Sequence, residues 1–342
     1  MTKKMNAYGF YDPQKEQNTL PFEKIEMAIP EPKDREILVE VKAVSVNPTD
    51  LATRMMKKSS DESFTILGRD VSGTVKKVGE KVSLFKEGDD VFYPGSSNIT
   101  GAQADFHVID ERMVALKPKN LKHEEAAALP LTALTSYEVI HDRLNLFDLK
   151  EKPKDVTLLI VGAAGGVGSI ASQIALNYGF TVIGTASREQ SRAYIKDLGV
   201  KHIIDHSKPF GPQLEALGLL DIDAVFITAK TDENIDEVSK IINPQGRVCS
   251  LLPLRSPLPG RFFGKSITFS YELMYTRSVY KTSDWIKQHE YLTELKNQVE
   301  QGFISSNLET HFKEMNEDTL KAAYEKLQTH HTMGKIVLSH SR

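Results

Sequence analysis

One stretch of the chain has glycines at the spacing that a bound dinucleotide requires. It reads GAAGGVG over residues 162–168, and it lies between an apolar run at 156–161 and a helical pattern at 167–178. The pyrophosphate must approach the backbone closely, and the first helical turn offers N–H groups and a partial positive charge to it. The alternative is a tight turn without a ligand. The position between a strand and a helix favours dinucleotide binding through Gly162, Gly165, Gly166, Val167 and Gly168.

The end of the next strand indicates which dinucleotide fits. Proteins that bind NAD usually place Asp or Glu here to hold the ribose 2′-hydroxyl, whereas this strand ends in GTASR at 184–188. Arg188 can pair with a 2′-phosphate, and Ser187 can hydrogen-bond to it. In the alternative, Arg188 is a solvated residue at a helix start, and Glu189 falls inside that helix. We predict NADPH as the cofactor.

The elements around this loop alternate between strands and helices. Strand-like runs occur at 156–161, 181–185, 202–205, 223–228, 246–251 and 266–271, with helical patterns between them. This pattern predicts an α/β fold with a doubly wound parallel Rossmann sheet. The first 115 or so residues read instead as short strands with turns, which predicts a small barrel. The tail is too small to fold alone, so we expect a discontinuous domain of 1–128 plus 285–342 and a dinucleotide-binding domain of 129–284.

Composition excludes several classes of protein. The chain has 342 residues, a formal net charge of −3 and one cysteine, Cys249. The length predicts two domains, and the charge gives no reason to expect nucleic acid or an anionic membrane as a partner. One thiol excludes an intramolecular disulfide and any zinc site that needs two cysteines. With no secretory signal and no apolar run of about 18–20 residues, we predict a cytoplasmic protein.

Several segments, read together with the glycine loop, resemble the medium-chain dehydrogenase/reductase superfamily. The likeness is greatest to its quinone oxidoreductase branch and to proteins labelled zinc-type alcohol dehydrogenase-like. The segments are SVNPTD at 45–50, LGRDVSGTV at 67–75, GDDV at 88–91, ALPLTALT at 128–135 and GKIVL at 334–338. The resemblance implies a GroES-like β-barrel that the tail completes, with the cofactor in the cleft between this barrel and the Rossmann domain.

The resemblance also locates the positions where zinc-dependent members hold a catalytic zinc. Asn47 stands at the first cysteine, and Arg69 and Asp70 stand where the family has histidine and glutamate. The second cysteine would lie within 128–131, which contains no thiol, and the structural zinc lobe is missing. Arginine does not deprotonate in proteins and cannot ligate zinc. We therefore predict no zinc, and we expect Asp50 and Arg69 to form a structural ion pair across this position.

The chemistry expected of such a site is reduction. Without a Lewis acid, nothing stabilises the alkoxide that alcohol oxidation requires. A conjugated acceptor is easier to reduce, since its electrons delocalise into an enolate or hydroquinone and hydride transfer needs mainly proximity. We predict an NADPH-dependent reductase of quinones or α,β-unsaturated carbonyls. The alternatives are a zinc-type alcohol dehydrogenase and a non-enzymatic NADPH-binding sensor or interaction protein.

Position in the family pattern adds candidates to the site. Asn47 is expected to hydrogen-bond the substrate oxygen or the nicotinamide, and capping of a turn is an equal alternative. Tyr93 is a candidate proton donor, with packing as the alternative. Thr132 and Lys335 are expected to contact the cofactor, although they could be a helix N-cap and a surface lysine. Two strand-end residues face the crevice where such sheets bind ligands, and one histidine is placed like a family aromatic near the adenosine phosphate. These are Thr228, Leu251 and His206.

The strand at 266–271 would form an edge of the Rossmann sheet. Exposed edges invite pairing with another chain, and relatives dimerise by joining these edges. The resemblance therefore implies a homodimer.

Overall fold

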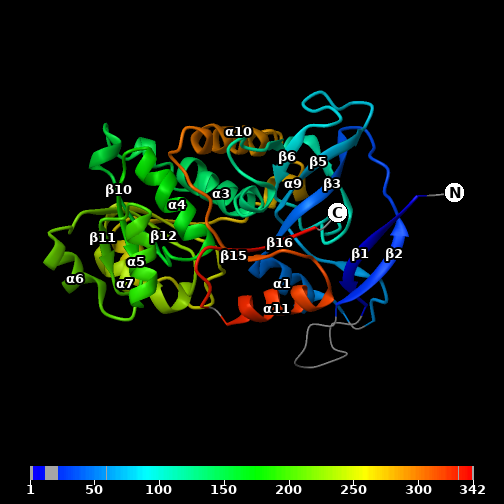
Figure 1. Ribbon diagram of the computed structural model, residues 1–342. Helices are drawn as coiled ribbons and strands as arrows, with labels where there is room; N and C mark the ends of the chain where they lie inside the picture. Colours follow the sequence, from blue (N-terminus) through cyan, green and yellow to red (C-terminus); the bar gives the residue numbers. More distant parts are fainter. Residues whose placement is uncertain (1–2, 12–21, 59, 330, 341–342) are drawn as a thin grey trace. The chain divides into compact units, whose positions relative to one another are not determined.

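The computed structural model describes residues 3–11, 22–58, 60–329 and 331–340 of the 342 residues. The described chain divides into two compact units (Figure 1). One contains the chain up to Leu131 and again from Tyr275, and the other runs from Thr132 to Met274. The sequence placed these junctions at 128/129 and 284/285. Each unit is described by itself below.

The unit at 132–274 is built on a six-stranded sheet whose registers are all parallel. Its spatial order is β11-β10-β9-β12-β13-β14, which is the doubly wound order 3-2-1-4-5-6. The predicted α/β class with a Rossmann sheet is thereby confirmed. The strands are β9 (Thr157–Val161), β10 (Thr181–Thr185), β11 (His202–Ile204), β12 (Ile222–Ile227), β13 (Ile242–Ser250) and β14 (Thr268–Tyr271).

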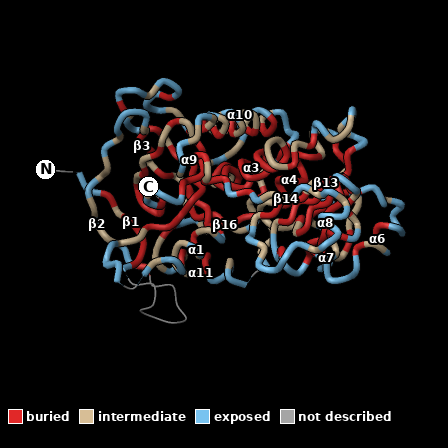
Figure 2. Tube along the Cα trace, turned by 180° about the vertical axis from the view of Figure 1, so that it is seen from behind, coloured by how far each residue is buried: buried red, intermediate tan, exposed pale blue. Residues whose placement is uncertain are grey.

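Central strands of this sheet are buried along their whole length. Every residue of β9 and β12 is buried, and Figure 2 shows red, buried chain in the interior around β13 and β14. Strands covered on both faces need near-continuous apolar runs, which is the pattern of their sequences. The connecting helices are α4 (Gly166–Asn177), α5 (Glu189–Asp197), α6 (Phe210–Leu217), α7 (Thr231–Ile241) and α8 (Gly260–Gly264).

Two predicted elements differ from the structure. The helix expected over 132–146 is α3 (Pro130–Tyr137), followed by one π-helical segment, Glu138–Arg143. The last strand begins at Thr268 rather than Ser266, because Ser266 has φ +53° and its N–H closes a turn on the Phe263 carbonyl.

The other unit contains the predicted short strands. Its larger sheet has the order β15-β16-β3-β5-β6-β8, and β7 also pairs with β3. A smaller sheet has the order β2-β1-β4. The strands are β1 (Lys4–Phe10), β2 (Glu23–Ala28), β3 (Glu36–Val46), β4 (Thr65–Ile66), β5 (Val71–Val78), β6 (Asp90–Tyr93), β7 (Phe106–Asp110), β8 (Ala115–Leu116), β15 (Leu308–Phe312) and β16 (Lys335–Ser339).

The chain's end closes this unit, because β16 is inserted between β15 and β3. Helices α10 (Lys287–Glu300) and α11 (Glu317–Gln328) belong to the same tail, while α1 (Pro48–Met56) and α2 (His123–Ala126) come from the N-terminal part. Trp285, Leu320 and Tyr324 of the tail share one apolar core with Ile37 and Val91. The tail is therefore an integral part of the unit.

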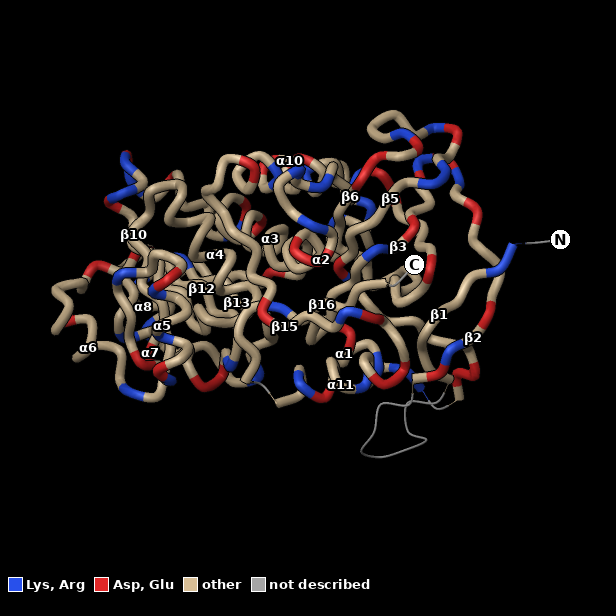
Figure 3. Tube along the Cα trace, viewed as in Figure 1, with Lys and Arg blue, Asp and Glu red and all other residues tan. Residues whose placement is uncertain are grey.

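Basic and acidic residues are interspersed along the trace of each unit (Figure 3). Within the described ranges, every helix is too short or too polar to cross a lipid bilayer.

Candidate active site

The glycine loop connects β9 to α4, as its sequence predicts. Gly162 has φ +83°, a conformation that favours glycine. A Cβ on Gly168 would lie 2.3 Å from the Gly162 carbonyl oxygen and 2.7 Å from the Ala163 Cα. The first α-helical bond of α4 runs from the Ser169 N–H to the Gly165 carbonyl at 3.0 Å. The N–H groups of residues 166–168 precede that bond, so they lie at the positive end of the helix dipole.

The end of β10 lies beside this loop. The Gly162 N–H donates to Thr185 Oγ1 at 3.0 Å, and Thr185 Oγ1 is 3.3 Å from His206 Nδ1. Burial lowers the pKa of His206, which favours a neutral imidazole. Ser187 and Arg188 follow on the exposed surface before α5. Sequence analysis overlooked Thr185, since a threonine in a strand carries no signal of such a contact.

Two other predicted residues lie at the carboxyl ends of β12 and β13. Thr228 Oγ1 donates to the Val161 carbonyl at 2.8 Å, which ties the end of β12 to the end of β9. The Leu251 N–H donates to the Ile227 carbonyl at 3.1 Å, and its side chain is half-buried. The order of the sheet reverses between β9 and β12, where doubly wound folds bind their ligands. The glycine loop and Thr228 therefore meet at the switch point.

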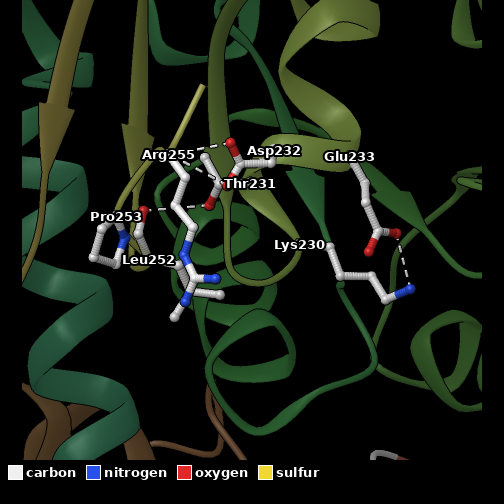
Figure 4. Close-up of a pocket in the computed structure, with 7 residues that line it drawn as sticks. All are labelled: Lys230, Thr231, Asp232, Glu233, Leu252, Pro253 and Arg255. Carbon is white, nitrogen blue, oxygen red and sulfur yellow. Dashed lines mark hydrogen bonds and ion pairs between the residues drawn. The ribbon is translucent and has the colours of Figure 1, made fainter. Parts of the chain in front are cut away.

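A small hollow lies beside the start of α7, between the loops that follow β12 and β13 (Figure 4). Asp232 fastens the second loop, since its Oδ1 accepts the N–H groups of Arg255 at 3.0 Å and Ser256 at 2.8 Å. Lys230 and Glu233 point toward each other and pair at 2.9 Å. These contacts hold the rim of the crevice in place. The hollow is lined by Lys230, Thr231, Asp232, Glu233, Leu252, Pro253 and Arg255.

A buried polar cluster lies in the unit formed by the chain up to Leu131 and again from Tyr275, which we call the barrel unit. The end of β3 and the starts of β5 and β16 meet there. The antiparallel register that pairs Ile336 with Val46 brings Lys335 opposite Asn47. Asp70 directly precedes β5, and its carbonyl accepts the Ser45 N–H at 2.9 Å. The Asp70 side chain accepts from Lys335 Nζ at 2.7 Å, Asn47 Nδ2 at 2.9 Å, the Leu131 N–H at 2.6 Å and Ser45 Oγ at 3.3 Å. Lys335 also donates to Asn47 Oδ1.

The side chain of Asn47 therefore belongs to this cluster, although its backbone is the N-cap of α1. The cap is completed by Asp50, whose Oδ2 accepts the Asn47 N–H at 2.8 Å while its Oδ1 accepts the Gly68 N–H at 3.0 Å. Complete burial raises the pKa of Asp50 to about 6, against the pull of the nearby Arg69 charge.

The expected ion pair between Asp50 and Arg69 is wrong. Arg69 Nη1 donates instead to the carbonyls of Ser96 and Ile99, the latter at 3.0 Å. Asp50 accepts from backbone N–H groups and Arg69 donates to backbone carbonyls, so their charges interact without forming an ion pair. The buried ion pair of this region is Lys335 with Asp70, whose side chains are 5% and 0% exposed.

The donors at this position do not fit zinc. Asn47 offers a neutral amide, Arg69 a guanidinium, and Asp70 already accepts an ammonium and three other donors. Zinc sites in proteins are built from Cys, His and carboxylate ligands. Across the described ranges, no three His, Cys, Asp or Glu side chains are grouped as a metal site would need. Cys249 is buried in β13, in the other unit, where burial raises its pKa to about 12.

The remaining two candidates are both buried. Tyr93 is 0% exposed, and its hydroxyl is 3.1 Å from His107 Nδ1. His107 Nε2 is 2.9 Å from the Thr100 carbonyl, so Nε2 carries the proton and Nδ1 accepts from Tyr93. Thr132 lies inside α3, where its carbonyl accepts from Ser136 Oγ at 2.7 Å. The tyrosine proton is thus used within the barrel.

Two family models match this chain. Residues 33–119 match the alcohol dehydrogenase GroES-like domain, and residues 166–292 match the zinc-binding dehydrogenase family. A zinc-type alcohol dehydrogenase-like protein of Staphylococcus epidermidis is 37% identical over 336 residues, which cover 98% of this chain and 99% of the relative. A 2-methylene-furan-3-one reductase of Solanum lycopersicum is 35% identical over 192 residues, covering 53% of this chain and 47% of that protein.

A solved structure also matches this chain over its full length. A crystal structure from Rhizobium etli, of a protein assigned to the zinc-dependent alcohol dehydrogenases, superposes with a TM-score of 0.94. Its sequence is 38% identical, and the match covers 100% of both chains.

Proposed function

Because this chain belongs to the medium-chain dehydrogenase/reductase superfamily of oxidoreductases, we propose that it is an NADPH-dependent reductase of quinones or α,β-unsaturated carbonyls that works without zinc. The observation that carries the proposal is the cluster of Asn47, Asp70 and Lys335, whose groups suit a polar substrate oxygen better than a metal ion. The tomato relative, named as a reductase of a compound with a C=C bond conjugated to a ketone, supports the substrate class.

The choice of NADPH rests on the end of β10. The carboxylate that would hold a ribose 2′-hydroxyl is replaced by Ser187 and Arg188, both exposed and directly beyond the strand. A guanidinium and a hydroxyl suit a 2′-phosphate, which a carboxylate would repel. When bound, NADPH supplies the hydride. The glycine loop and the start of α4 would hold its pyrophosphate, and His206, Thr228 and Leu251 would line the crevice.

In this proposal Asn47 donates a hydrogen bond to the substrate oxygen, and Asp70 and Lys335 hold its side chain in place. Reduction of a conjugated carbonyl places negative charge on the substrate oxygen, which a hydrogen-bond donor stabilises. The Nδ2 group of Asn47 has two N–H bonds, and one of them is directed at Asp70. Asp70 and Lys335 hold the amide in one orientation, so the second N–H has a fixed direction. No role in the reaction is proposed for Tyr93. The single cysteine suits the reducing, cytoplasmic location that we also propose.

Cofactor preference tests this proposal directly. Wild-type protein is expected to oxidise NADPH, and not NADH, in the presence of 1,4-benzoquinone or a simple enone such as methyl vinyl ketone. In Arg188→Ala, NADPH affinity is expected to fall about tenfold or more, because one charge-assisted hydrogen bond contributes about 1.5–3 kcal/mol, while NADH affinity stays the same. Fluorescence titration with both dinucleotides measures the difference.

Arg261→Ala serves as the control, since it also removes an exposed arginine of the same unit but leaves the end of β10 intact. Tighter binding of NADH than NADPH by the wild type would contradict the choice of cofactor. Zinc-dependent alcohol oxidation without quinone or enone reduction would contradict the proposed reaction.

We propose a homodimer formed through β14. Among the residues that the structure describes, this strand is the edge of the sheet and pairs only with β13. Exposed apolar side chains lie on it and beside it, including Phe263 at 93%, Leu273 at 57% and Tyr271 at 50% exposure. Pairing of two such edges would extend the sheet and cover these side chains.

The proline substitution Tyr271→Pro should therefore produce monomers, since it removes a backbone N–H from the outer side of the edge strand, opposite to β13. Light scattering at micromolar concentration measures the mass. Leu258→Pro, in the exposed loop after β13, is a control that leaves β14 unchanged. A monomeric wild type would contradict this proposal.

A further inference from the structure

Lys335 is a charged side chain in a place where charge is costly. It is the first residue of β16, and its side chain is 5% exposed. Asp70, which is completely buried, lies 2.7 Å away and offsets the cost of burying the ammonium. The pair is not required to join the strands, because β16 is already bonded to β3 from Ile336 to Ser339. The buried charge of Lys335 is therefore not needed to join β16 to β3.

The geometry leaves this ammonium with capacity to bind a further acceptor. An ammonium has three N–H bonds, and within the described ranges two acceptors are found, Asp70 Oδ2 and Asn47 Oδ1. These two acceptors also fix the position of Nζ. The Arg69 guanidinium is directed away from this cluster, since its Nη1 donates to the carbonyls of Ser96 and Ile99.

The ammonium also lies where the family pattern expects a metal ion. Asn47 stands at a zinc-ligand position, and its Oδ1 accepts a hydrogen bond from Lys335. The cluster thus holds one ammonium, supplied by the chain itself and paired with the Asp70 carboxylate, next to a position at which zinc-dependent relatives would polarise a substrate oxygen. A fixed cation can perform that electrostatic task without a metal.

We propose that the Lys335 ammonium, held by Asp70 and Asn47, donates a hydrogen bond to the carbonyl oxygen of the substrate and stabilises the negative charge that develops there. The inference rests on the proposed reduction of enones or quinones. In that reduction the enone gains a C–H bond at its β-carbon from the hydride of NADPH, which is oxidised to NADP⁺. The π electrons of the C=C bond move to give an enolate, whose oxygen Lys335 stabilises, and water supplies the proton to the α-carbon.

Two variants at this position test the proposal. Lys335→Met removes the charge and the hydrogen-bond donor. Lys335→Gln removes the charge but keeps a polar group, and it is used if the methionine variant does not fold. In both, kcat/KM for methyl vinyl ketone and 1,4-benzoquinone should fall about 100-fold, the effect of deleting one oxyanion donor. NADPH affinity should be retained, because the glycine loop belongs to the other unit.

Glu111→Gln is a matched control for lost stability. Glu111 is another completely buried carboxylate of the same unit, which pairs with Arg35 at 2.6 Å and accepts the N–H groups of Ser83 and Leu84 at 2.8 Å. It lies outside the Lys335 cluster. Its variant should be less stable than wild type, with kcat/KM unchanged at a temperature where all the variants are folded.

A spectroscopic probe tests Lys335 without turnover. The phenolate of 4-nitrophenol is a model of the oxyanion, and its absorption band reports ionisation. Bound to the wild type, 4-nitrophenol should ionise about tenfold more readily than in Lys335→Gln, since a hydrogen bond from a charged donor contributes about 1.5–3 kcal/mol.

The two proposals fail in different ways. A wild type that oxidises NADPH with neither substrate overturns the proposed function, while the ionisation of 4-nitrophenol still tests Lys335. An active wild type whose Lys335 variants keep both their kcat/KM and the ionisation of bound 4-nitrophenol overturns the role of Lys335.

Discussion

A Gly168→Ala variant is expected to bind NADPH about 100-fold more weakly than the wild type, and to be less stable by about 1–3 kcal/mol. The added Cβ would lie 2.3 Å from the Gly162 carbonyl oxygen and 2.7 Å from the Ala163 Cα. Both are backbone atoms, so the first turn of α4 must move away from the loop. The N–H groups at 166–168 would then no longer converge on a phosphate. Calorimetric titration with NADPH and urea unfolding measure the two effects.

Gly211→Ala provides the control for this substitution. Gly211 lies in α6 of the same unit, and a Cβ there would have no atom within 4 Å. This variant should bind NADPH as the wild type does and be equally stable or slightly more so, because alanine favours the helix. Unchanged NADPH affinity in Gly168→Ala would show that the close approach at Gly162 is not needed for binding.

An Asp70→Asn variant is expected to lose about 3–5 kcal/mol of unfolding free energy, the usual cost of removing one partner of a buried ion pair. The asparagine can still accept from the Leu131 N–H, but the Lys335 ammonium would be buried without a counter-charge. Urea unfolding at neutral pH measures the loss, and the barrel unit should be affected first, since both residues belong to it.

The double variant Asp70→Asn with Lys335→Met separates charge pairing from other effects. It leaves no unpaired buried charge, so its loss should be smaller than the sum of the two single losses by about 1–3 kcal/mol. The exposed pair of Lys4 and Glu26, at 3.0 Å, is the control and should show a coupling below about 1 kcal/mol. Additive losses at Asp70 and Lys335 would contradict the assignment of this pair as a coupled buried unit.

The dinucleotide-binding loop was predictable because its signals are local. Gly162 and Gly168 are six residues apart, and the strand, loop and helix that they join are consecutive in the chain. The apolar run at 156–161 predicts a buried strand for the same reason, since a strand that is covered on both faces needs an apolar sequence of its own. Only contacts between strand ends, such as that of Thr185 with the Gly162 N–H, were missed.

The polar cluster of Asn47, Asp70 and Lys335 was not predictable in this way. Asp50 and Arg69 were expected to pair because both lie near the missing metal in the family pattern, yet each finds backbone partners instead. For Lys335, the alternative of a surface lysine is wrong, because the side chain is buried against a carboxylate. Sequence pattern reveals which residues are charged, but it does not reveal which charges share one buried space.

The sequence by itself determined the fold class, the family and the position of the glycine loop, since each depends on periodicity or on spacing within a short segment. Only the tertiary structure decided the partner of Asp70. Lys335 is 265 residues away from it in the chain, and the register of β16 on β3 brings the two together. A buried ammonium is stable only where folding supplies a carboxylate, and that condition is met by the assembled barrel rather than by any segment of it.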